Sequence, residues 1–90
     1  MTYQVEITSK TESPEDNLPG QFHAGSGSDR GTFKVTGKPT PTEGEVAAFM
    51  MGEILGFMIL DYNEETGEGY FVVVDDYAPA AGTIYIYDGR

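Results

Sequence analysis

The chain has 90 residues, no cysteine and a formal net charge of −10, from 15 acidic and five basic residues. A chain of this length forms one domain with a thin core, and the lack of cysteine excludes disulfide bonds, a thiolate nucleophile and a zinc–thiolate site. No apolar run reaches the ~20 residues needed to span a bilayer, and no signal-peptide pattern opens the chain. We therefore expect a cytoplasmic, soluble, single-domain protein over residues 1–90.

The first regular segment is residues 2–9, in which Tyr3, Val5 and Ile7 alternate with polar residues. Such alternation is typical of a half-buried strand. Residues 10–20 follow with two prolines, an acidic patch and a glycine, which indicates a surface loop.

Residues 21–37 predict a hairpin. Its first arm, 21–24, is short, and its second arm, 32–36, places Phe33 and Val35 toward the core. A Gly-Lys-Pro sequence then ends the strand and leads the chain to the next element.

Residues 40–56 form the one convincing helix. Thr40 as N-cap, Pro41 as the first helical residue and Glu43 as the third predict a capping box. The apolar stripe at helical spacing comprises Val46, Met50, Ile54 and Phe57, widened by Ala47, Met51 and Leu55.

The helix has two candidate ends. It stops at Gly56, a glycine suited to the left-handed position after a helix, or it continues to about Asp61. We favour the stop at Gly56, because the β-rich runs 57–62 and 70–76 flank the turn-rich segment 63–69 and predict a hairpin.

The C-terminal third predicts the remaining strands. Residues 71–74 are continuously apolar, which favours a central strand covered on both faces. Residues 83–87 form the last strand, with Ile84 and Ile86 inside and the tyrosines outside, or the reverse.

The order β-β-α-β-β-β predicts an α+β fold in which a single helix packs on a four- to five-stranded, mostly antiparallel sheet. This order resembles that of β-grasp (ubiquitin-like) domains, as an analogy of element order only. The terminal Asp-Gly-Arg lacks the Gly-Gly tail that the sulfur-carrier and modifier versions use.

The single histidine does not belong to a recognisable catalytic motif. A catalytic interpretation would pair His23 with Ser26 or Ser28 and with Asp29. Catalytic triads are, however, assembled by the fold and not by local spacing. Residues 25–31 are rich in Gly and Ser, yet they lack the Gly-Lys-Ser/Thr of a phosphate-binding loop. We therefore expect a turn here and no enzymatic activity.

Residues 61–67 carry oxygen-bearing side chains at alternate positions, as a calcium loop does. The glycine expected at its sixth position is Thr66, and the glutamate expected at its twelfth is Val72. We expect no dedicated metal site and no cofactor, and a weak calcium-binding module is the third interpretation of the chain.

Charge is distributed unevenly, since residues 43–90 hold ten acids and one base. Tyrosines are interspersed among these acids, and tyrosine faces and carboxylates both bind guanidinium groups. We therefore predict a partner-binding surface formed by Asp61, Tyr62, Glu64, Glu65, Glu68, Tyr70, Asp75, Asp76, Tyr85 and Tyr87.

Such a surface repels nucleic acid and anionic membranes and attracts basic proteins. In size and charge the chain resembles the small acidic phage and mobile-element proteins that block host restriction or CRISPR complexes. The resemblance implies a non-enzymatic inhibitor that binds the basic surface of a nucleic-acid-handling protein, with carboxylates in the place of phosphates. The alternative is a homo-oligomeric domain that associates through the helix strip Ala48, Gly52 and Gly56, where another backbone can approach closely.

Overall fold

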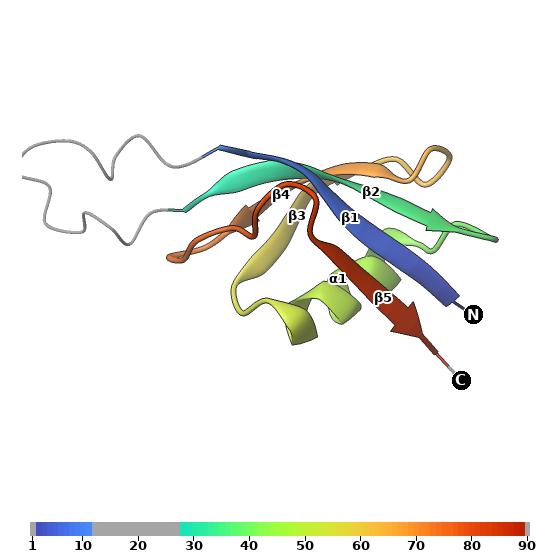
Figure 1. Cartoon of the computed structure of the whole chain (residues 1–90). Helices are drawn as coiled ribbons and strands as arrows, with labels where there is room; N and C mark the ends of the chain where they lie inside the picture. Colours follow the sequence, from blue (N-terminus) through green and yellow to red (C-terminus); the bar gives the residue numbers. More distant parts are fainter. Residues whose placement is uncertain (1, 12–27, 90) are drawn as a thin grey trace, which may run out of the picture.

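The computed structural model describes residues 2–11 and 28–89. It contains five strands and one helix: β1 (Thr2–Thr11), β2 (Arg30–Gly37), α1 (Glu43–Glu53), β3 (Phe57–Tyr62), β4 (Glu68–Val73) and β5 (Ile84–Asp88). The predicted α+β class and the order β-β-α-β-β-β are confirmed (Figure 1).

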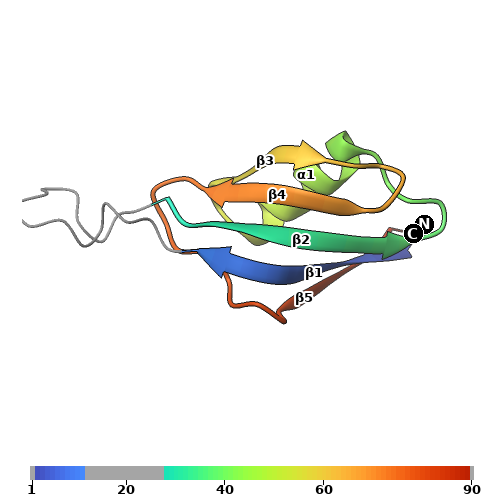
Figure 2. The ribbon, with the colours of Figure 1, turned by 90° about the horizontal axis from the view of Figure 1, so that it is seen from above.

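The strands form one sheet in the order β3-β4-β2-β1-β5, and all neighbours are antiparallel. Figure 2 shows β2 in the middle of this sheet, with β3 and β5 at its edges. β2 pairs with β1 and β4. The first arm of the predicted hairpin, 21–24, lies outside the described residues. β4, predicted as a central strand, has neighbours on both sides, and its residues 71–73 are buried. Val74, also predicted to be covered, follows the strand and is 40% exposed.

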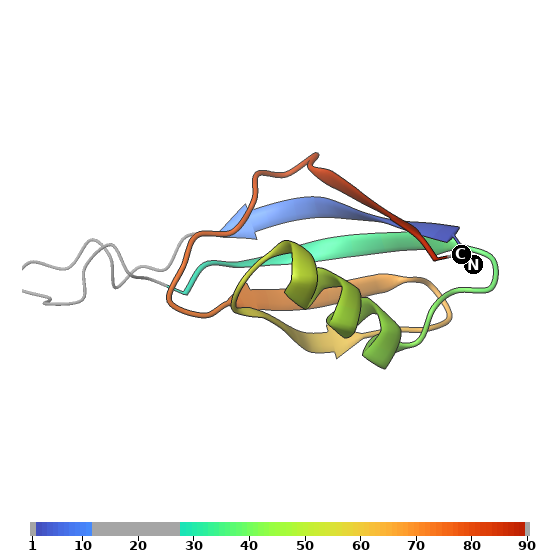
Figure 3. The ribbon, with the colours of Figure 1, turned by 90° about the horizontal axis from the view of Figure 1, so that it is seen from below.

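The helix covers one face of the sheet, as seen from below in Figure 3. The core lies between the two layers and contains Tyr3, Val5, Ile7, Phe33, Val35, Val46, Met50, Phe57, Phe71, Val73 and Ala78. Three phenylalanines from β2, β3 and β4 pack together, with Phe57 and Phe71 stacked at a ring separation of 4.9 Å. Each such ring contributes roughly 1.5–3 kcal/mol by leaving water, so this cluster holds the helix-side face of the sheet together.

The helix begins two residues later than predicted. Its N-cap is Thr42, whose side chain accepts a hydrogen bond from the Glu45 N–H, while the Glu45 carboxylate accepts one from the Thr42 N–H at 2.8 Å. The predicted box at Thr40 is wrong because Pro41 is buried and its carbonyl oxygen accepts a hydrogen bond from the Tyr62 hydroxyl at 2.8 Å. That contact fixes Pro41 outside the helix.

The helix ends at Glu53, three residues before the predicted stop. The Ile54 N–H still bonds to the Met50 carbonyl. Gly56 is left-handed, with φ of 87°, and its carbonyl accepts a hydrogen bond from the Val74 N–H. The alternative of a helix to Asp61 is wrong, because β3 starts at Phe57.

The buried face of the helix is rotated from the predicted one. Val46 and Met50 are buried as predicted, but Met51 and Leu55 are 61% and 85% exposed. Phe49 is half-buried instead and packs against Tyr3 and Tyr87. The reason is tertiary: β1 and β5 supply aromatic surface on the Phe49 side of the helix.

The last strand adopts the second of the two predicted orientations. Tyr85 and Tyr87 pack against the core on the helix side, and Ile84 and Ile86 are exposed. The pairing of Tyr3 with Tyr87 across β1 and β5 explains this choice, because their rings stack at 4.8 Å.

Candidate functional site

The β3–β4 turn is held by its own side chains. The Asn63 side-chain oxygen accepts hydrogen bonds from the N–H groups of Glu65 and Thr66, and the Thr66 hydroxyl accepts one from the Glu68 N–H. The turn also docks on β2, since the Val35 N–H donates to the Gly67 carbonyl at 2.7 Å. These bonds fix the backbone that carries three glutamates.

A hydrogen bond joins this turn to the start of the helix. The Glu43 N–H donates to a carboxylate oxygen of Glu64 at 3.2 Å. A carboxylate is favoured there, because the first N–H groups of a helix are unpaired and carry partial positive charge. Figures 1 and 3 show the hairpin turn and the start of α1 at the same end of the molecule. We call this region the acidic end; its exposed carboxylates belong to Glu43, Glu45, Glu64, Glu65 and Glu68.

Lys34 of β2 partly balances the charge of the acidic end. Lys34 lies opposite Glu68 across β2 and β4, and opposite Glu6 across β2 and β1. Five carboxylates nevertheless gather from the two short segments 43–45 and 64–68, so the local charge remains strongly negative.

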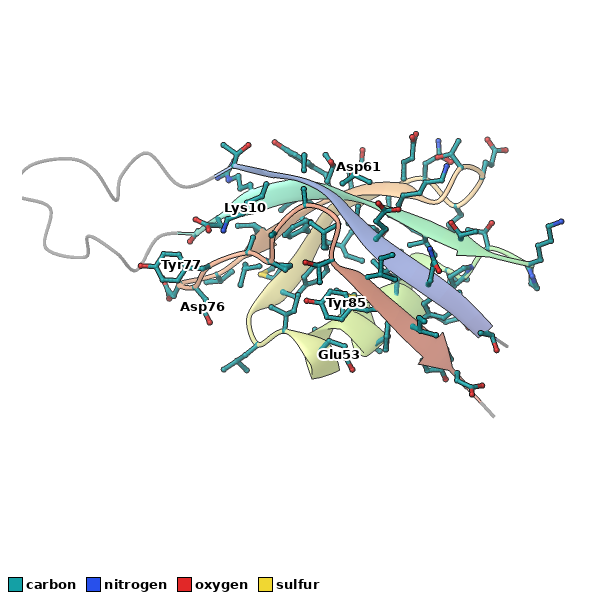
Figure 4. All side chains as sticks on the ribbon, viewed as in Figure 1. Lys10, Glu53, Asp61, Asp76, Tyr77 and Tyr85 are labelled. Carbon is teal, nitrogen blue, oxygen red and sulfur yellow. The ribbon has the colours of Figure 1, made fainter. Side chains whose placement is uncertain are left out.

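The ten residues predicted as one binding surface fall into three groups. Glu64, Glu65 and Glu68 belong to the acidic end. Asp61 and Tyr70 are cross-strand partners beside it, and Figure 4 shows Asp61 on the face of the sheet away from the helix.

A second group lies at the far end of the sheet. Asp75 and Asp76 follow β4, and Figure 4 shows Asp76 and Tyr77 at the end away from the hairpin turn. Asp75 has a positive φ of 57° and Asp76 accepts a hydrogen bond from the Tyr77 N–H. Both are part of a tight turn separate from the acidic end.

The third group consists of the tyrosines on the helix side. Tyr62 stacks on Phe33 at 5.9 Å, and burial raises its pKa. Burial also raises the pKa of Tyr85, with a smaller contribution from nearby Glu53, which Figure 4 shows beneath it. Tyr62 and Tyr85 are therefore half-buried and pack against the core, and Tyr87 lines the pocket described next.

A pocket of about 330 Å³ lies between α1 and the β1–β5 pair, lined by Tyr3, Glu45, Ala48, Phe49 and Tyr87. Phe49 meets the stacked tyrosines edge-on, at 5.6 Å from Tyr3 and 5.3 Å from Tyr87. The Tyr3 hydroxyl donates to the Glu45 carbonyl at 3.2 Å. Burial, with smaller contributions from Tyr87, Glu45 and Tyr62, raises the pKa of Tyr3 to about 12, so its hydroxyl stays protonated at neutral pH. We call this the aromatic pocket.

Sequence reasoning missed this pocket. Its rings come from both ends of the chain and the middle of the helix, and the β1–β5 register alone brings Tyr3 to Tyr87. The available signal was the period-two pattern of two strands. Tyr3 lies on the apolar face of the first strand, and Tyr85 and Tyr87 share one face of the last strand. Glu45 belongs to both the pocket and the acidic end.

The small-residue strip of the alternative interpretation is only partly on the helix. Ala48 and Gly52 are exposed, and space is open around Gly52. Gly56 lies beyond the helix, against the backbone of Val74.

Asp29, which the sequence suggested only as a neighbour of His23, has a buried carboxylate in the structure. Asp29 is fully buried, accepts a hydrogen bond from the Ala78 N–H at 3.1 Å and lies 3.9 Å from the Lys10 ammonium group. His23 and Ser26 lie outside the described residues. Asp29 therefore ties β1 to the segment after β4.

Over residues 2–11 and 28–89, no three His, Cys, Asp or Glu side chains are grouped closely enough to hold a metal ion. In the calcium-like segment, the Asn63 and Thr66 side-chain oxygens already accept backbone N–H groups. Within the same described ranges, no helix is both long and apolar enough to cross a membrane.

No family model matches this chain, and comparisons with curated proteins and with solved structures gave no match.

Proposed function

We propose that this is a non-enzymatic interaction protein whose acidic end binds the basic surface of a nucleic-acid-handling protein. The observation that carries the proposal is the Glu43–Glu64 hydrogen bond, which holds the hairpin tip against the helix start. This contact brings exposed carboxylates from two separate segments to one end of the molecule.

Charge supports a basic partner. The net charge of −10 favours encounter with cationic surfaces, over a range of about 8–10 Å at physiological salt. A partner that normally binds phosphates offers lysines and arginines, which also bind carboxylates. The protein would then compete with nucleic acid and inhibit its partner, as the small acidic phage inhibitors that it resembles do. The proposal places it in the cytoplasm, where such complexes work.

A competition assay tests this proposal. A labelled arginine-rich peptide is titrated with the protein, and fluorescence anisotropy follows binding at low and high salt. We expect binding that weakens with salt and that duplex DNA displaces. A peptide that binds DNA but not this protein would refute the proposal.

Two double variants locate the surface. Glu65→Gln with Glu68→Gln removes two charges from the acidic end, and Glu53→Gln with Asp76→Asn removes two charges elsewhere. The first pair should weaken peptide binding about tenfold, since exposed ion pairs are modest individually. The control pair has the same net charge and should bind nearly as tightly as wild type. An equal loss of peptide binding in both double variants would contradict a localised acidic site.

A second candidate function is self-association through the helix. The observation that favours it is the exposure of Met51 on the helix and of Leu55 just after its end, together with the exposed small residues Ala48 and Gly52. Analytical ultracentrifugation of wild type and Leu55→Glu tests it. A dimer that the substitution dissociates supports the second candidate, and a wild-type monomer at high concentration refutes it.

A further inference from the structure

The aromatic pocket has a chemistry that the acidic end alone lacks. Three of its five lining residues are aromatic, from β1, α1 and β5, and a fourth is a glutamate. Its volume is about 330 Å³, and pockets of this size and lining are typical of small-ligand sites.

We propose that the aromatic pocket binds a guanidinium group, the side chain of one arginine of the basic partner. The assignment of the arginine to a partner rests on the proposed function. The chemistry of the pocket does not, because aromatic faces attract cations through their quadrupoles.

The carboxylate of Glu45 favours a cationic ligand over a neutral one in this pocket. Its Oε1 atom accepts the bonds from the Thr42 N–H and hydroxyl, at 2.8 Å and 3.0 Å. Those bonds lower the pKa of Glu45, so the carboxylate is charged at neutral pH. They also hold the side chain in place beside the pocket.

The start of a helix would normally repel a cation. Here two first-turn N–H groups are already bonded, that of Glu43 to Glu64 and that of Glu45 to the Thr42 hydroxyl. The surrounding carboxylates of the acidic end further offset the positive end of the helix dipole.

Arginine fits better than lysine. The guanidinium group is planar, stacks on aromatic faces and is more weakly hydrated than an ammonium group. Phe49 and Tyr87 are both half-buried and present ring surface to the pocket. A planar guest can lie on one ring while its N–H groups reach the glutamate.

The direct test uses small probes and isotope-labelled full-length protein. N-acetyl-arginine amide is titrated while NMR follows the backbone amides of Glu45, Ala48 and Phe49. The matched probe is N-acetyl-citrulline amide, in which an uncharged urea replaces the guanidinium group. We expect saturable shifts for arginine, with a dissociation constant on the order of 1–10 mM, and shifts at least about fivefold weaker for citrulline. Equal responses to both probes would overturn the cation assignment.

Two variants and two controls examine the pocket without dismantling the core. Glu45→Gln retains a side-chain acceptor for the capping box, since glutamine also serves there, and should weaken arginine binding about threefold to tenfold. Glu53→Gln, at the other end of α1 and outside both the pocket lining and the acidic end, is its control and should change little. Ala48→Gln fills the rim and should abolish binding, whereas Gly52→Gln, one turn along the helix, should leave it intact.

The same variants separate this inference from the proposed function. If the arginine-rich peptide binds the acidic end but Ala48→Gln does not weaken it, the pocket inference is overturned and the proposed function stands. If the arginine probe binds the pocket but the peptide does not bind, the proposed function fails and the cation site stands. If neither the probe nor the peptide binds, both are overturned.

Discussion

Gly67 offers a sharp test of how the acidic hairpin is held. Its φ of 81° is left-handed, and a Cβ atom added there would overlap the carbonyl oxygen of Val35. The carbonyl oxygen of Gly67 accepts a hydrogen bond from the Val35 N–H at 2.7 Å. Gly67→Ala therefore strains the turn and pushes it away from β2. Gly52→Ala is the matched control, because Gly52 lies in the helix with open space around it.

The two substitutions should change the free energy of unfolding in opposite directions. A left-handed conformation costs an alanine about 1–2 kcal/mol, and loss of the hydrogen bond to Val35 adds about 1 kcal/mol. Gly67→Ala should thus destabilise the fold by about 2–4 kcal/mol once the overlap with β2 is included. Gly52→Ala should stabilise it by roughly 0.5–1 kcal/mol, the difference in helix propensity.

Urea denaturation followed by circular dichroism measures both changes. For a domain of this size, 1 kcal/mol corresponds to about 4–8 °C in Tm, so thermal melts should separate the variants by at least about 10 °C. Equal and mild effects of the two substitutions would refute the docking of the turn on β2. They would also remove the physical basis for a rigid acidic end.

Three further outcomes are expected. Thr42→Ala should destabilise the fold by about 1 kcal/mol through loss of the N-cap, measured by urea denaturation; no change would contradict the observed helix start. Asp29→Ala should cost about 2–4 kcal/mol, because a buried N–H of Ala78 and the Lys10 ammonium group lose their partner, whereas Asp29→Asn keeps an acceptor and should cost about half as much. Since the folded pKa of Tyr3 is raised to about 12 from 10.0, its contribution to stability is full below pH 10 and is lost as the pH rises through 12. Stability of Tyr3→Phe should therefore fall less steeply than that of wild type between these values; parallel curves would contradict the assignment.

The strands were predictable because their burial follows local alternation. Tyr3 and Val5 on β1, and Phe33 and Val35 on β2, are buried as period-two patterning requires. The start of the helix could not be predicted from the sequence, although a capping box was correctly expected. Two overlapping segments, 40–43 and 42–45, fit the same pattern, and the choice depends on the distant Tyr62 hydroxyl.

The candidate site shows the same division between local and distant causes. Acidity of the 64–68 turn is evident in the sequence, but its contact with the Glu43 N–H joins residues 21 positions apart. The aromatic pocket depends on the pairing of the first and last strands. Neither pairing partners nor strand order follow from periodicity, so the predicted surface combined acids from opposite ends of the sheet.

The central claim is that a basic ligand binds at the acidic end. The most direct measurement is a titration of isotope-labelled protein with an arginine-rich peptide at low salt, with every resolved amide followed by NMR. The account predicts shifts concentrated in residues 43–48 and 64–68 that disappear as salt is raised. Shifts centred on Asp75 and Asp76, or spread evenly over all exposed carboxylates, would contradict it.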